Sequence, residues 1–178
     1  MSAHPPKICV IGLRDSGWSL ASLIANAGFP IVVCDNDRNV LDAFCVQKGV
    51  DPLEPARDLS SIETVIVALP DAKNTAAMLV GTYGLARLLQ PGTCVINLRA
   101  SEACLMLSVA LAEHSVDYLS ADLKGDFDHG DAGALDVVVA GAEEAMHHRS
   151  ALFEVMGTVR YAGPLTHQGR SEALDAAH

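Results

Sequence analysis

The sequence has few aromatic residues, no long apolar run and no signal-peptide pattern. Phe, Trp and Tyr make up 4% of the 178 residues while 50% are hydrophobic, so the core must be built mainly from Val, Ile, Leu and Ala, as is typical of α/β proteins. The apolar runs are shorter than a bilayer-spanning segment, and the first residues lack the charged and apolar regions of a leader. The length predicts one domain with a core of ordinary size.

The chain also lacks closely spaced cysteines and an excess of basic residues. Its cysteines lie singly in apolar surroundings, which predicts reduced core residues and a cytoplasmic protein. The net charge of −10 argues against nucleic acid or an anionic membrane as a partner. Hydrolase and kinase functions have no support, because Gly-x-Ser-x-Gly, Walker and Cys/His motifs are missing. The cysteines are Cys9, Cys34, Cys45, Cys94 and Cys104.

The clearest motif that is present is a glycine turn between an apolar run and an amphipathic segment. Residues 8–11 predict a buried strand, and residues 18–27 carry apolar side chains at helical spacing. Residues 31–34 predict a second buried strand that ends at Asp35. Strand, turn, helix, strand and terminal acid occur in this order in dinucleotide-binding βαβ units.

The residues of this turn match the chemistry of a dinucleotide site at all but one position. Gly12 lets the chain turn sharply off the strand, and Gly17 lets the helix pack against it. The helix N-terminus directs N–H groups at a pyrophosphate, and Asp35 is placed to accept hydrogen bonds from an adenosine ribose. Position 14, where the fingerprint has glycine, carries Arg14. Arg14 either crowds the phosphates or pairs with them, so a Rossmann domain that has lost its ligand is the alternative.

Strands and helices alternate through the rest of the chain. We predict one doubly wound, Rossmann-like α/β domain over residues 7–165, with a mostly parallel sheet and helices on both faces. Residues 1–6 are expected to be a disordered tail and residues 166–178 a polar tail. The expected helices are 37–47, 55–62, 75–89 with a break around Gly81 and Gly84, 101–114 and 143–156. The expected further strands are 50–53, 64–69, 93–98, 118–121, 134–140 and 158–162.

Two of these segments carry specific expectations. Ser101 is predicted to cap a helix that is apolar nearly all round, and such a helix should be covered on both sides. Residues 122–133 are predicted to be a polar loop. Its acidic residues fail the calcium-loop pattern because Gly130 falls where a ligand is needed, so we predict no metal site.

Three longer segments carry a family resemblance. They are IGLRDSG, VIVALPDAKNTAAMLVGTYGLARLLQPGTCVINL, and VVVAGAEEAM with LFEVMGTVRYAGP. Through these segments the chain resembles the N-terminal cofactor domain of the β-hydroxyacid dehydrogenases, over about residues 7–165. This family includes 3-hydroxyisobutyrate, 6-phosphogluconate and L-threonate dehydrogenases. The middle segment is the most specific, because Leu-Pro-Asp follows a strand and Leu-x-Pro-Gly precedes the next at the family's spacing.

The resemblance implies NAD or NADP as the cofactor. The acid at position 35 favours NAD, since a carboxylate repels a 2′-phosphate, while Arg14 and Arg38 nearby oppose that preference. The cofactor-binding residues that the resemblance implies are Gly12, Leu13, Arg14, Asp15, Ser16, Gly17, Asp35, Asn36, Leu69, Pro70, Asn74 and Ala100.

The catalytic positions depart from the family. Residues 97–101 read Asn-Leu-Arg-Ala-Ser where the family has an Asp-x-Ser-Thr stretch, and Lys124 replaces the serine of the substrate loop. Glu172 falls where the family has its general acid/base lysine, and a glutamate there repels an acidic substrate. We expect the chain to lack the family's helical C-terminal domain, with residues 166–178 as its truncated start. Lys124 remains the one catalytic candidate.

Three functions are open. The chain is an NAD(P)-binding domain that is catalytically incomplete alone, an active reductase of a small hydroxyacid or semialdehyde with Lys124 as the acid, or a nucleotide-free dimeric interaction module. We favour the first, with a dinucleotide and a small carboxylate substrate as ligands, because the dinucleotide-binding residues match the family better than the catalytic ones. Arg99, Arg14 and Lys124 are predicted to form a basic pocket. A homodimer that covers the apolar helix at residues 104–112 is expected.

Overall fold

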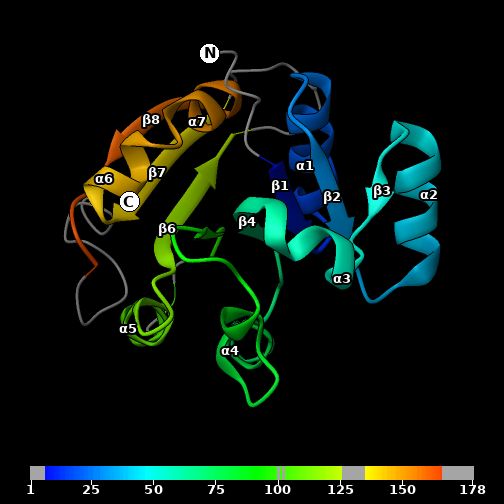
Figure 1. Cartoon of the computed structure of the whole chain (residues 1–178). Coiled ribbons are helices and arrows are strands. Elements are labelled where there is room, and N and C mark those ends of the chain that lie inside the picture. The colour runs from blue at the N-terminus through cyan, green and yellow to red at the C-terminus, as the bar shows by residue number, and fades with distance from the viewer. Residues whose placement is uncertain (1–6, 100, 102, 126–134, 166–178) are drawn as a thin grey trace, which may run out of the picture.

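The computed structural model describes residues 7–99, 101, 103–125 and 135–165, which form one eight-stranded sheet flanked by helices (Figure 1). The strands are β1 (Lys7–Ile11), β2 (Ile31–Cys34), β3 (Asp51–Pro52), β4 (Ile62–Val67), β5 (Cys94–Asn97), β6 (Asp117–Lys124), β7 (Leu135–Gly141) and β8 (Gly157–Tyr161). The helices are α1 (Ser16–Asn26), α2 (Arg38–Lys48), α3 (Pro55–Asp58), α4 (Ala72–Val80), α5 (Cys104–Ala112), α6 (Glu143–His147) and α7 (Ser150–Met156). The two predicted tails lie outside the described residues.

The strand order fixes where a ligand site belongs. The sheet runs β3-β2-β1-β4-β5-β6-β7-β8, and neighbouring strands are parallel apart from β6 and β7, which are antiparallel. The chain moves outward from β1 to β3 and then returns to place β4 on the other side of β1. Ligands of open α/β sheets bind at such a reversal, outside the carboxyl ends of the strands. The predicted doubly wound, mostly parallel fold is confirmed.

Side chains alternate along the central strands and divide the core into two layers. Ile8 and Val10 of β1 pack on the side of α1, α2 and α7, whereas Cys9 and Ile11 pack on the side of α4 and α5. Figure 1 shows α1 and α7 on one side of the sheet and α4 and α5 side by side on the other. Among the described helices, none is both long and apolar enough to cross a bilayer.

The cysteines behave as unreactive thiols where they are buried. All five are free, and Cys9, Cys94 and Cys104 are buried as predicted, while Cys34 and Cys45 are only partly covered. Burial raises the pKa of Cys9 and of Cys94 to about 12, so both thiols keep their protons at neutral pH. These residues pack as small apolar side chains.

The loop predicted from residue 122 begins later than expected. β6 continues through Lys124, which pairs with Asp136 of β7, and Leu123 pairs with Val137. The polar residues of this stretch indicated a loop, but antiparallel pairing with β7 supplies backbone partners that local polarity does not reveal. Lys124 therefore lies on a strand rather than in a loop.

The single helix predicted for residues 143–156 is two helices. α6 ends at His147 and α7 begins at Ser150, because Arg149 leaves helical geometry with φ −116° and ψ 18°. The Arg149 guanidinium donates to the carbonyl oxygens of Gly92 at 3.0 Å and Glu63 at 3.4 Å. These partners are far away in sequence, so the local pattern gives no sign of the break.

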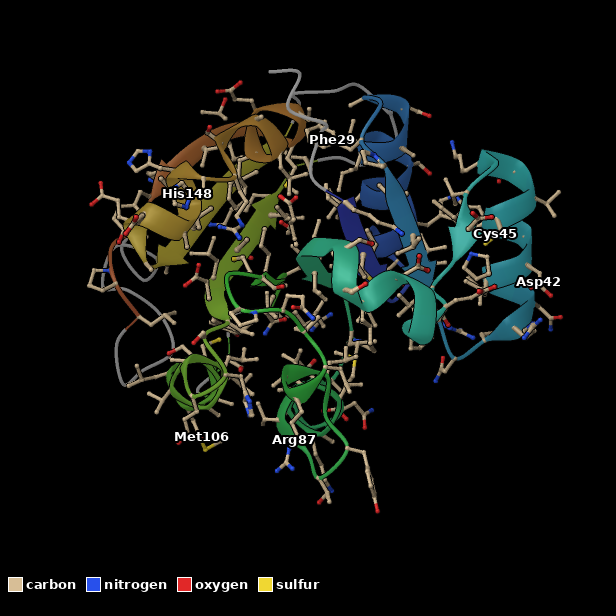
Figure 2. The ribbon with its side chains drawn as sticks, viewed as in Figure 1. Phe29, Asp42, Cys45, Arg87, Met106 and His148 are labelled. Atoms are coloured by element: carbon tan, nitrogen blue, oxygen red, sulfur yellow. The ribbon has the colours of Figure 1, made fainter. Side chains whose placement is uncertain are left out.

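Helix α5 differs from its prediction in both its start and its exposure. The N-cap position is Ala103, not Ser101, whose carbonyl oxygen instead accepts from the Cys104 N–H at 3.0 Å. Leu107 faces the core, yet Met106 is 65% and Val109 59% exposed among the described residues. Figure 2 shows Met106 on the outer side of α5. The expectation that this helix is covered on both sides is therefore wrong for the described part of the chain.

Candidate functional site

Backbone hydrogen bonds connect the end of β1 and the glycine turn to both neighbouring strands, at the point where the strand order reverses. The Gly12 N–H donates to the Cys34 carbonyl oxygen of β2 at 2.8 Å. On the other side, the Ala68 N–H donates to the Ile11 carbonyl oxygen, also at 2.8 Å. The turn is thus held over the carboxyl ends of β2, β1 and β4.

Both glycines that frame the turn are required by its geometry. Gly12 has φ +92°, and a Cβ there would lie 2.7 Å from the Ala68 carbonyl oxygen. A Cβ on Gly17 would lie 2.1 Å from the Gly12 carbonyl oxygen and 3.2 Å from the Ala68 Cβ. Helix α1 therefore packs directly on the end of β1, which brings its first N–H groups to the reversal point.

The start of α1 has no side-chain cap, although the Gly17 N–H donates to the Arg14 carbonyl oxygen at 3.0 Å. Asp15 occupies the N-cap position with φ 50° and ψ −124°, makes no side-chain capping bond, and no acidic residue lies in the first turn. By contrast, Asp37 caps α2 by accepting from the Asn39 N–H at 3.0 Å. An uncapped N-terminus carries partial positive charge and fits an anion such as a phosphate.

Asp35 is fixed in place by two backbone N–H groups. One carboxylate oxygen accepts from the Leu13 N–H at 2.7 Å, and the other accepts from the Asp37 N–H at 2.8 Å. Each oxygen keeps a lone pair for a further donor, such as a ribose hydroxyl. Asp35 is half-buried and Asn36 exposed beside it, while Leu13 is buried beneath the turn.

Arg14 does not lie alone over the turn. Its guanidinium forms an ion pair with the Asp37 carboxylate, and its side chain is 61% exposed. The arginine therefore reaches across to the turn after β2, beside Asp35. The sequence gave a choice between crowding the phosphates and pairing with them, and it did not predict that Arg14 pairs with Asp37.

A second helix N-terminus meets the site from β4. Asp71 caps α4 by accepting from the Lys73 N–H at 2.8 Å. Leu69 is half-buried, and Pro70 and Asn74 are exposed near this helix start. These three predicted residues lie at the carboxyl end of β4, next to the end of β1 in the sheet.

A buried polar network at the ends of β5 and β6 was missed by sequence reasoning. The Asn97 amide donates to the Arg99 carbonyl oxygen and to the Tyr118 hydroxyl oxygen, both at 3.0 Å, and the Tyr118 hydroxyl donates to the Cys104 sulfur at 3.2 Å. Burial, with Cys104 nearby, raises the pKa of Tyr118, so it stays protonated. The network holds the stretch between β5 and α5. A lone Asn at the end of an apolar strand was the available signal.

The three residues of the predicted basic pocket lie after β1, after β5 and on β6. β6, which carries Lys124, lies three strands from β1 in the sheet, and strands are spaced about 4.8 Å apart, so about 14 Å separates it from the turn that carries Arg14. Arg99 is exposed just beyond β5, and Arg14 is paired with Asp37. That Arg14, Arg99 and Lys124 form one pocket stays a prediction.

Some predicted site residues lie outside the described part of the chain. They are Ala100, predicted beside the cofactor, and Glu172, at the family's lysine position. The acidic loop beyond Gly125 lies outside it as well. Among the residues that the structure describes, no group of three or more His, Cys, Asp and Glu side chains is arranged to hold a metal ion.

Comparison with known proteins identifies the family of this chain. A family model described as the NAD binding domain of 6-phosphogluconate dehydrogenase matches residues 7–163. The chain belongs to that family. It is an NAD-binding domain of the hydroxyacid dehydrogenase type, which confirms the predicted family and the dinucleotide as cofactor. Which residues contact the dinucleotide stays a prediction.

Relatives in this family are longer than the chain. The L-threonate dehydrogenase of Cupriavidus necator is 32% identical over 144 residues, which are 78% of this chain and 48% of that protein. The mouse mitochondrial 3-hydroxyisobutyrate dehydrogenase is 22% identical over 164 residues, 90% of this chain and 49% of that one. The chain therefore spans about half the length of the curated relatives it matches.

Solved structures agree on the fold. An imine reductase from Myxococcus stipitatus, in its V8 variant with NAD+, has a TM-score of 0.80 at 20% identity, covering 97% of this chain and 59% of the enzyme. The same reductase was also solved with NADP+. At this identity the likeness shows the fold alone.

Proposed function

We propose that this chain binds NAD or NADP across the carboxyl ends of β1, β2 and β4 and does not complete a hydroxyacid dehydrogenase active site by itself. The observation that carries the proposal is the packing of Gly17 on the Gly12 carbonyl oxygen, which leaves room only for hydrogen and sets α1 on the end of β1. The proposed contacts are Gly12, Leu13, Arg14, Asp15, Ser16, Gly17, Asp35, Asn36, Leu69, Pro70, Asn74 and Ala100.

Each part of the site suits one part of a dinucleotide. The uncapped start of α1 suits the pyrophosphate, and the Asp35 carboxylate, held by the Leu13 and Asp37 N–H groups, suits the adenosine ribose. When bound, the nicotinamide supplies hydride transfer, and the residues of this chain bind and orient it. The five free cysteines support a reducing compartment such as the cytoplasm.

The residues at the family's catalytic positions support the proposal that the chain binds a dinucleotide but does not catalyse the reaction alone. Asn97 is engaged with Tyr118 and with the backbone of Arg99, so it holds a loop rather than a substrate. Lys124 pairs in register with Asp136 on β7, and β6, which carries it, lies three strands away from β1 and the glycine turn. The proposal predicts no oxidation of hydroxyacids and no reduction of semialdehydes by this chain alone, as measured by absorbance of the reduced nicotinamide.

Thermal unfolding tests the proposal. The chain is heated with NAD+, NADH, NADP+ and NADPH in separate titrations. Ligand at about 100 times its dissociation constant should raise the free energy of unfolding by roughly 2.7 kcal/mol, because it binds the folded chain only. A rise in the melting temperature with at least one cofactor is expected. The absence of any rise with all four at millimolar concentration would contradict it and favour the nucleotide-free module.

We propose further that the chain forms a homodimer through α5. Met106 and Val109 expose apolar surface on one side of this helix. Arg87 and Glu113 lie exposed and line the adjoining groove. Their opposite charges suit self-association about a two-fold axis, in which each residue of one copy can meet its counterpart on the other. Sedimentation velocity at micromolar concentration is expected to show a dimer that Met106→Glu converts to monomer. Val46→Glu, on the exposed side of α2, is the matched control and should stay dimeric. A monomeric wild type would contradict the interface.

A further inference from the structure

Two acidic residues and one arginine meet where the adenosine ribose is proposed to bind. Asp35 uses both carboxylate oxygens to accept backbone N–H groups, one of them from Asp37. Asp37 in turn pairs with the Arg14 guanidinium. The other arginine near this turn, Arg38, pairs with Asp42 at 3.3 Å, and both of those side chains are largely exposed. Arg14 is thus the cation directed at the Asp35 and Asp37 turn.

The Arg14–Asp37 ion pair determines the charges that surround a 2′-phosphate at this site. In βαβ dinucleotide sites, an acid at the end of the second strand accepts from the ribose 2′-hydroxyl, and an arginine nearby accommodates a 2′-phosphate. Here Arg14 has the position of such an arginine, yet its charge is neutralised by Asp37. A 2′-phosphate would therefore meet two carboxylates and a guanidinium that must first leave its partner. A ribose hydroxyl meets no such repulsion.

We propose that Asp37, through its ion pair with Arg14, sets the preference of this site for NAD over NADP. Asp37 is a positioning residue that acts through Arg14, and Arg14 becomes the phosphate-binding residue once it is released. A guanidinium binds a phosphate dianion through charge-assisted, bidentate hydrogen bonds, so a free Arg14 favours the 2′-phosphate strongly. The inference rests on the proposed binding of a dinucleotide at this site.

Asp37→Asn isolates the charge of this residue. Asparagine is as good an N-cap as aspartate, so the bonds that start α2 are kept while the ion pair with Arg14 is lost. Dissociation constants for NAD+ and NADP+ are measured by isothermal titration calorimetry. The variant is expected to bind NADP+ at least about tenfold more tightly than wild type, with NAD+ binding changed by less than about threefold.

Two further variants separate this role from a general effect of charge. Asp51→Asn removes an exposed carboxylate from β3, the strand next to β2, and leaves both the Arg14–Asp37 and the Arg38–Asp42 pairs. This control should bind both cofactors as wild type does. Adding Arg14→Ala to Asp37→Asn should remove most of the gain in NADP+ affinity and leave only the part that comes from the lost repulsion by the Asp37 carboxylate.

The outcomes are distinct. Equal gains in NADP+ affinity from Asp37→Asn and Asp51→Asn, or a gain that survives Arg14→Ala in full, would overturn the role of the ion pair while leaving dinucleotide binding intact. NADP+ binding that Asp37→Asn leaves unchanged would overturn it as well. If wild type and all variants bind neither NAD+ nor NADP+, the proposed function itself fails, and this inference fails with it.

Discussion

Replacing Gly17 by alanine is expected to destabilise the domain by about 3 kcal/mol and to weaken dinucleotide binding by at least about tenfold. The new methyl carbon would lie 2.1 Å from the Gly12 carbonyl oxygen and 2.9 Å from its carbonyl carbon, both backbone atoms of the turn. Helix α1 must then move off β1, which takes its N–H groups away from the pyrophosphate position. Urea unfolding measures the stability loss, and calorimetric titration with NAD+ measures the binding loss.

Gly28→Ala is the matched control for this substitution. Gly28 ends the same helix with φ +88°, and a Cβ there would meet nothing within 4 Å. The control should lose only about 1 kcal/mol of unfolding free energy, because alanine is strained in the left-handed backbone conformation of this position. It should bind NAD+ as wild type does. If Gly17→Ala were as stable as this control and bound NAD+ normally, the close packing of α1 on β1 would not be what builds the site.

Replacing Arg149 by methionine is expected to destabilise the domain by about 2–3 kcal/mol without changing dinucleotide affinity. The residue is 8% exposed, and its guanidinium donates to carbonyl oxygens of Ala145, Glu63 and Gly92. Methionine fills much of the same space but leaves these acceptors without their donor. Glu63 lies near the start of β4 and Gly92 precedes β5, so the contact is at the opposite edge of the sheet from the glycine turn.

Urea unfolding and calorimetric titration check this prediction too. Arg160→Met, on the exposed side of β8, is the control and should leave stability nearly unchanged. Because methionine also removes a buried charge, a neutral or positive change in stability at Arg149 would mean that desolvation of the guanidinium outweighs its three hydrogen bonds, contrary to our expectation. A loss of NAD+ affinity would contradict our expectation that the Arg149 contact and the dinucleotide site, at opposite edges of the sheet, are independent.

The sequence was sufficient where short-range patterns determine the structure. The turn between Gly12 and Gly17 and the acid at position 35 depend on residues close together in the chain, and each lies where its pattern predicts. Alternation of buried strands with helices likewise gave the doubly wound fold, because parallel strands buried on both faces are continuously apolar.

The sequence was insufficient where distant residues decide. The break between α6 and α7 depends on bonds from Arg149 to Glu63 and Gly92, and the extension of β6 to Lys124 depends on pairing with β7. The partner of Arg14 was equally hidden, since Asp37 is 23 residues away. These features follow from tertiary pairing that overrides local polarity and helical periodicity.

The most direct measurement of the central claim is a set of ¹⁵N–¹H correlation spectra of this chain titrated with NAD+. The account predicts saturable shifts of the backbone amide signals of Leu13, Ser16 and Gly17, together with that of Asp37 at the ribose end. Signals from the exposed side of α5, such as Met106, should stay in place. Unchanged signals in the glycine turn at millimolar NAD+, or shifts confined to α5, would contradict a dinucleotide site at the end of β1.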